Sequence, residues 1–174
     1  MRVIAGEFRS RKLLSVPGLE TRPTPDRLRE TLFNILGDRL EGSVFVDAYA
    51  GTGAVGIEAL SRGARHVVFI EKDRRAAEVI RKNLQALGAE SRARIIQGAA
   101  HLHLRDLDAN IVFLDPPYTR EREYTACLDT LELKPPELTV VQHSVRFTLA
   151  DEYGPLRRTR IVKQGDNALS FFRG

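Results

Sequence analysis

The chain has 174 residues, of which 43% are hydrophobic and 29% are charged, and its net charge is +4. This length suits one α/β domain with a sizeable core and is too short for two full domains, while the composition excludes a disordered or fibrous chain. No apolar stretch approaches the length that spans a membrane, and the positive charge permits a polyanionic partner without establishing one.

The N-terminal segment alternates apolar and basic side chains, and Arg9, Arg11 and Lys12 supply most of its charge. Such alternation predicts a short strand pair with one solvated, cationic face. We therefore expect residues 1–20 to form a basic β-hairpin extension and residues 21–174 to form the main domain.

A rigid, proline-rich segment precedes the first predicted helix. Apolar residues recur at helical spacing from Leu28 until Gly37 ends the pattern, which predicts a helix over residues 26–36. Thr24 is the expected N-cap, with Pro25 in the first turn.

From Val44 onward the chain alternates between apolar strands and helices. The predicted strands cover residues 44–46, 67–70, 94–97, 111–114 and 138–141. Continuously apolar strands separated by helices predict a parallel sheet that is covered on both faces. Residues 156–163 and 168–172 then predict an antiparallel C-terminal hairpin. We expect a doubly wound, mostly parallel, Rossmann-like α/β fold.

A glycine loop follows the strand at residues 44–46. Its sequence from Gly51 to Gly56 matches the dinucleotide-binding fingerprint, and Glu71 lies at the distance expected of an acid that holds ribose hydroxyls. Asp47, at the end of the strand, suits a cationic methionine ammonium and would be badly placed beside a pyrophosphate. The pattern favours S-adenosyl-L-methionine over a nicotinamide, although the glycine motif alone also occurs in loops that bind no cofactor.

The motif Asp115-Pro116-Pro117-Tyr118 follows the fourth strand. An exocyclic amine on a nucleobase is a poor nucleophile, and two fixed acceptors favour the geometry that exposes its lone pair. The side chain of Asp115 and the carbonyl of Pro116 are the natural pair, and the prolines restrict the loop that presents them. Tyr118 is expected to stack on the target base, and Asp115 to accept a proton late in the reaction. The alternative is a proline turn with an incidental aspartate.

Five segments carry a resemblance to a known family, and they run in that family's order. They are residues 2–6, 21–27, 50–64, 71–73 and 115–118. The chain resembles the bacterial 16S rRNA guanine-N2 methyltransferases of the RsmD type. The resemblance implies a seven-stranded methyltransferase sheet with an N-terminal β-hairpin. It also implies transfer of a methyl group to N2 of one guanine in 16S rRNA, within an assembling small subunit, which leaves S-adenosyl-L-homocysteine.

The sequence departs from the family's pattern at two places. An acid is expected after the third strand to meet the adenine amino group, and Gly98 and Ala99 stand there instead, so we expect backbone contacts. An acid is also expected near the end of the fifth strand, which reads Gln142-His143. The cofactor site is expected to comprise Asp47, Gly51, Thr52, Gly53, Glu71, Lys72, Gly98 and Ala99.

Five basic residues are candidates for contacts with RNA phosphates, namely Arg9, Arg11, Lys12, Arg22 and Arg27. A solvated basic face is the alternative, and Arg22 and Arg27 also suit a role in shaping the mouth of the active site.

Neither the histidines nor the single cysteine suggests further chemistry. His101 and His103 lack converging ligands, so we expect no metal site. Cys127 and Tyr124 are interpreted as core residues. A single cysteine fits a reducing cytoplasm, and the N-terminus lacks the long apolar core of a signal peptide, so we expect a cytoplasmic protein. We also expect it to act as a monomer.

Other functions remain open at this point. An adenine-N6 methyltransferase acting on DNA or RNA shares the same acidic clamp, but on DNA it usually needs a recognition insert that this chain lacks. A glutamine methyltransferase would favour Asn at position 115. A non-catalytic RNA-binding module is the alternative of a different class, and a nicotinamide-dependent reductase is the most distant.

Overall fold

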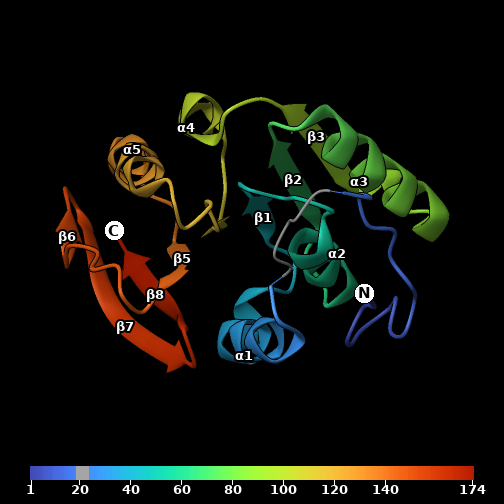
Figure 1. The fold of residues 1–174 in the computed structure, drawn as a ribbon, viewed down its shortest axis with the longest axis horizontal. Helices are drawn as coiled ribbons and strands as arrows, with labels where there is room; N and C mark the ends of the chain where they lie inside the picture. The colour runs from blue at the N-terminus through green and yellow to red at the C-terminus, as the bar shows by residue number, and fades with distance from the viewer. Residues whose placement is uncertain (19–23) are drawn as a thin grey trace.

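The computed structural model describes residues 1–18 and 24–174 as one α/β unit built on an eight-stranded sheet (Figure 1). The strands are β1 Val44–Asp47, β2 His66–Glu71, β3 Ala93–Gln97, β4 Ile111–Leu114, β5 Leu138–Ser144, β6 Glu152–Tyr153, β7 Leu156–Gln164 and β8 Asn167–Arg173. The helices are α1 Asp26–Leu36, α2 Ala54–Ser61, α3 Arg74–Leu87, α4 Ala100–His103 and α5 Glu121–Glu132. Short 3₁₀ turns cover Gly37–Arg39, Glu90–Arg92 and Leu104–Asp106.

The sheet runs in the order β3-β2-β1-β4-β5-β8-β7-β6. The first five strands of this order are parallel, and β8, β7 and β6 continue it in antiparallel fashion. The predicted fold class and C-terminal hairpin are therefore confirmed. The expectation of seven strands is wrong by one, because the two-residue β6 is too short to leave an alternating pattern.

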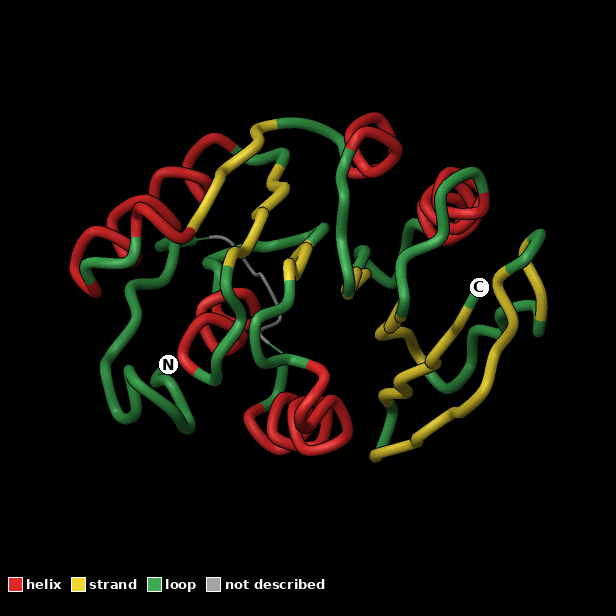
Figure 2. The backbone as a smooth tube through the Cα atoms, turned by 180° about the vertical axis from the view of Figure 1, so that it is seen from behind, coloured by secondary structure: helices red, strands yellow, loops and turns green. Residues whose placement is uncertain are grey.

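Helices cover both faces of the sheet, and each face has its own apolar core. Helices α1, α2 and α3 pack on one face, and α4 and α5 pack on the other (Figures 1 and 2). Strands β4 and β2 pair with opposite edges of β1, so the chain reverses its direction of progress across the sheet at this strand. Ligands of doubly wound folds bind beyond the carboxyl ends of the strands at such a switch point.

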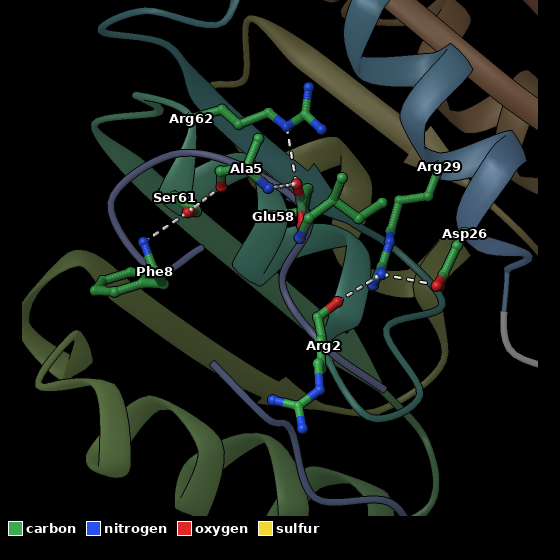
Figure 3. Close-up of polar contacts among 9 residues, drawn as sticks. Arg2, Ala5, Phe8, Asp26, Arg29, Glu58, Ser61 and Arg62 are labelled. Carbon is green, nitrogen blue, oxygen red and sulfur yellow. Dashed lines mark hydrogen bonds and ion pairs between the residues drawn. The ribbon is translucent and has the colours of Figure 1, made fainter. Parts of the chain in front are cut away.

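The N-terminal segment forms only a short antiparallel pairing, in which the Val3 amide donates to the Arg11 carbonyl at 3.0 Å and the Leu13 amide to the Met1 carbonyl at 2.9 Å, and it folds back onto α2. A single bridge joins Arg2 to Lys12, where a ladder would need several. The reason lies in Glu58, whose carboxylate accepts the amides of Ile4 and Ala5 at 2.9 and 3.0 Å (Figure 3). These two amides already donate to a side chain, so they cannot form the backbone bonds that would extend a β-ladder.

Buried polar side chains hold this segment in place. Ser61 accepts the Phe8 amide through its hydroxyl at 2.9 Å, and the same hydroxyl donates to the Ala5 carbonyl at 2.6 Å (Figure 3). The fully buried Arg29 donates to the Arg2 carbonyl at 2.8 Å. Because these buried side chains bond to its backbone at several points, the segment is an integral part of the fold, although Nε and Nη1 of Arg29 find no partner among the described residues.

The first helix begins and ends where predicted, but its cap differs. The N-cap is Pro25, and no side chain bonds to the first-turn amides. The expectation that Thr24 caps the helix is therefore wrong, since its hydroxyl faces Asp115 and Gln142 instead. The short α4 between β3 and β4 was also not anticipated. Among the described residues, no helix is long and apolar enough to cross a membrane.

Close packing of α2 on the sheet generates a stability prediction. A Cβ built on Gly56 would lie 2.3 Å from Cε1 of Phe69, a ring that is itself fully buried on β2. We expect Gly56→Ala to lower the free energy of unfolding by about 1–3 kcal/mol, measured by urea denaturation. Phe69→Leu vacates part of the space that the ring occupies. The double variant should therefore lose less free energy of unfolding than the sum of the losses in the two single variants. A strictly additive double variant would contradict this packing.

Candidate active site

The two sequence motifs meet because their strands are neighbours. β1 pairs in parallel with β4, with Asp47 opposite Phe113, and the Ala48 amide donates to the Phe113 carbonyl at 3.0 Å. Asp115 follows this pairing by two residues. The acid that ends β1 and the acid that follows β4 therefore lie at the same edge of the sheet, as the crevice at a switch point requires.

The glycine loop is held by Glu71, at the end of β2. Gly51 adopts a φ of +56°, which suits glycine, and its amide donates to one carboxylate oxygen of Glu71 at 2.6 Å. The other oxygen accepts the Asp73 amide at 2.8 Å. Burial raises the pKa of Glu71, and these amides oppose that rise. Each oxygen keeps a second lone pair, so Glu71 can also accept from the hydroxyls of a ligand.

Asp47 lies beneath the loop and is almost fully buried. Its carboxylate accepts the amide of Gly56, in the first turn of α2, at 2.9 Å. Burial raises its pKa from 3.8 to about 7, the amide bond opposes this, and the nearby Glu71 adds to it. A buried carboxylate with so high a pKa is a site that a cationic ligand group would stabilise in its charged form.

Asn83 links the glycine loop to the N-terminal segment. Its side chain, on α3, donates to the Thr52 carbonyl at 3.1 Å and to the Leu14 carbonyl at 3.2 Å. It also accepts the Leu14 amide at 2.8 Å. No pattern in the sequence singles out this residue, because an asparagine inside an amphipathic helix usually faces solvent.

The adenine end of the expected site has a neighbour that was not predicted. The Gly98 amide donates to the Glu71 carbonyl at 3.1 Å, and Ala99 begins α4 without a side-chain cap. A Cβ on Gly98 would lie 2.5 Å from Nε2 of His103. The imidazole therefore borders the place where an acid was expected. Lys72, directly after β2, is exposed.

The Asp-Pro-Pro-Tyr motif is held by two tyrosine hydroxyls. Tyr124, on α5, donates to the Pro116 carbonyl at 3.3 Å and packs against Phe147 with ring centroids 4.9 Å apart. Its interpretation as a packing residue was therefore incomplete. Tyr118 donates to the side-chain oxygen of Asn167, at the start of β8, at 2.5 Å. Burial raises the pKa of Tyr124, so its hydroxyl stays a neutral donor.

The basic candidates lie on two exposed surfaces. Arg9, Arg11 and Lys12 are exposed on the N-terminal segment, where Arg11 also donates to the Ala86 carbonyl at 2.9 Å. Arg27 is exposed in the first turn of α1. Arg22 lies outside the described residues.

Cys127 and His143 are both buried and have hydrogen-bond partners. Cys127 lies 3.1 Å from the Tyr49 hydroxyl, and burial raises the pKa of its thiol to about 11. His143 bonds to the Ser170 hydroxyl at 2.8 Å, and burial lowers its pKa. Within residues 1–18 and 24–174, no group of three or more histidine, cysteine or acidic residues is arranged to hold a metal ion.

Comparison with known proteins places the chain in a family. The family described as Conserved hypothetical protein 95 matches residues 1–173. The chain is 34% identical to the protein YlbH of Bacillus subtilis, over 99% of this chain and 98% of that protein. It is 37% identical to "Ribosomal RNA small subunit methyltransferase D" of Haemophilus influenzae, over 82% and 78%. The solved structure of yhhF from Escherichia coli superposes with a TM-score of 0.87 at 33% identity, covering 99% and 97%. The chain therefore belongs to the Conserved hypothetical protein 95 family.

The raised pKa of Asp47 predicts how stability depends on pH. Because the folded state holds a proton that the unfolded state releases, Asp47 makes the free energy of unfolding fall as pH rises from about 4 to about 7. Asp47→Asn removes this titration and keeps an acceptor for the Gly56 amide. In urea unfolding without ligand, the variant should gain stability relative to the natural protein across this range. If the difference in free energy of unfolding between Asp47→Asn and the natural protein did not change with pH, the raised pKa of Asp47 would be contradicted.

Proposed function

We propose that this member of the Conserved hypothetical protein 95 family transfers a methyl group from S-adenosyl-L-methionine to the N2 amine of a guanine in 16S rRNA. The relative from Haemophilus influenzae is named as a small-subunit rRNA methyltransferase and aligns over most of both chains, which supports the reaction type and the substrate class. We place the reaction in the cytoplasm, on an assembling small subunit, with the protein acting as a monomer.

One observation carries the proposal. The pairing of β1 with β4 sets the glycine loop and the Asp-Pro-Pro-Tyr motif at the same edge of adjacent strands. A methyl transferase needs the donor and the acceptor side by side, and neither motif alone would provide this.

The residues of the loop suit adenosylmethionine, which supplies an electrophilic methyl group on a sulfonium. Glu71 retains lone pairs for ribose hydroxyls, while its other lone pairs fix the loop. Asp47 offers a buried negative charge for the cationic methionine end. Gly98 and Ala99 offer backbone groups to the adenine, beside the ring of His103.

The clamp prepares the amine for attack. Asp115 and the Pro116 carbonyl each accept one hydrogen of the amine, so the nitrogen lone pair is directed toward the donor. Tyr124 already donates to that carbonyl, which has a second lone pair for the amine. Asp115 then accepts a proton when the methylated amine becomes acidic. Tyr118 stacks on a base that has left its helix, held by its bond to Asn167.

The product of the reaction tests this proposal. Small subunits from cells that lack the gene would be incubated with radiolabelled adenosylmethionine, beside naked 16S rRNA and DNA, and digested to nucleosides. We expect label in N2-methylguanine, and a loss of about 100-fold or more in rate with Asp115→Ala. Label in N6-methyladenine would show that the target base is adenine and not guanine. A complete absence of label, with RNA still bound, would point to a non-catalytic binding module.

The exposed basic residues predict how RNA binding depends on salt. Arg9, Arg11 and Lys12 lie on the N-terminal segment, whose backbone bonds to Glu58 at Ile4 and Ala5. Of the three side chains, only that of Arg11 bonds to another described residue, through the Ala86 carbonyl. Replacing the three by alanine should reduce the slope of log affinity against log salt by about one unit per lost phosphate contact. Arg120→Ala, an exposed change on the other face of the sheet, serves as the control. An unchanged slope would place the RNA surface elsewhere.

A further inference from the structure

Three side chains from distant parts of the sequence meet at the clamp. The hydroxyl of Thr24, just before α1, lies 3.4 Å from one carboxylate oxygen of Asp115 and 3.4 Å from the side-chain oxygen of Gln142 on β5. Thr24 is 9% exposed and Gln142 is 4% exposed. Polar groups withdrawn this far from water need partners within the protein.

The hydroxyl of Thr24 has one hydrogen and faces two acceptors. A carboxylate is the stronger acceptor, so the hydrogen goes to Asp115. Rotating the Gln142 amide by half a turn about its last torsion exchanges its oxygen and nitrogen with no change of shape. The amide then donates to the Thr24 oxygen and the hydroxyl donates to Asp115, so that no acceptor faces another acceptor.

We propose that Thr24 is a positioning residue of the clamp, and that Gln142 holds Thr24 in its donating orientation. The hydroxyl engages one oxygen of Asp115 and so contributes to the orientation in which the carboxylate meets the target amine. This inference rests on the proposed function, because the clamp that Thr24 and Gln142 would position is the amine-binding part of that proposed active site.

The identity of residue 142 supports this relay. An acid is the residue expected near the end of this strand, and Gln142 stands there instead. A second carboxylate would compete for the single hydrogen of Thr24 and would bring a like charge close to Asp115 in a buried place. A neutral amide that can donate removes both conflicts.

The surrounding structure fixes Thr24 from its own side. Pro25 follows it directly and begins α1, and the side-chain amide of Gln164 on β7 donates to Thr31 of that helix at 2.7 Å. The helix is thereby tied to the C-terminal hairpin, so the position of Thr24 follows from the packing of α1. Arg27, three residues after Thr24, is exposed in the first turn of this helix.

Two substitutions of Thr24 distinguish a role as hydrogen-bond donor from a role in packing. Thr24→Val keeps the shape of the side chain and removes its hydrogen, whereas Thr24→Ser keeps the hydrogen. In methyl transfer to small subunits, Thr24→Val should lower kcat by about 10- to 100-fold and change the KM values less than about threefold. Thr24→Ser should stay within about threefold of the natural protein. Gln142→Glu, which adds the competing carboxylate, should lower kcat by at least about tenfold.

Three outcomes would overturn the proposal. The first is a Thr24→Val enzyme with natural kcat, the second is a Thr24→Ser enzyme as slow as Thr24→Val, and the third is a fully active Gln142→Glu. A crystal structure of Thr24→Val gives a readout that does not depend on activity. We expect the Asp115 carboxylate to rotate, and an unchanged carboxylate would refute the relay even if the natural protein methylated no RNA. Absence of transfer by the natural protein would instead refute the proposed function alone.

Discussion

The parallel pairing of β1 with β4 is the constraint on which the site depends. It fixes Asp47 opposite Phe113, and so brings two loops that are about sixty residues apart in the sequence to one edge of the sheet. Neither loop is regular structure, and each is held by side chains from other elements. Glu71 bonds to Gly51 in the first loop, and Tyr124 bonds to Pro116 in the second. The sheet gives the site its position, and these bonds give it its shape.

The N-terminal segment adds a second level of organisation. Glu58 and Asn83 are buried polar residues on α2 and α3, and both bind its backbone. Asn83 also bonds to the Thr52 carbonyl, so one side chain contacts both the basic segment and the glycine loop. The N-terminal segment and the glycine loop are therefore joined through a single side chain. The same design recurs at Thr24, which connects the start of α1 to Asp115.

Most of the fold was predictable because apolar runs of four or five residues, separated by helices, permit few arrangements. The motif residues could be proposed from the sequence because their chemistry depends on residue type and spacing, and the structure brings their two loops to one edge of the sheet. The supporting contacts could not be predicted. The sequence predicted Thr24 as a helix cap, yet its hydroxyl faces Asp115. In the N-terminal segment, the amides of Ile4 and Ala5 bond to Glu58 and do not extend a β-ladder. Such choices depend on which buried partner lies nearest in space, and a single sequence does not contain that information.

The central claim is that the glycine loop and the acidic clamp form one site for adenosylmethionine and an amine. A crystal structure with S-adenosyl-L-homocysteine tests it most directly. The account predicts the product with its ribose at Glu71, its ammonium toward Asp47 and its sulfur facing the loop of Asp115 and Pro116. A ligand bound with its sulfur away from this loop, or outside the edge shared by β1 and β4, would contradict it.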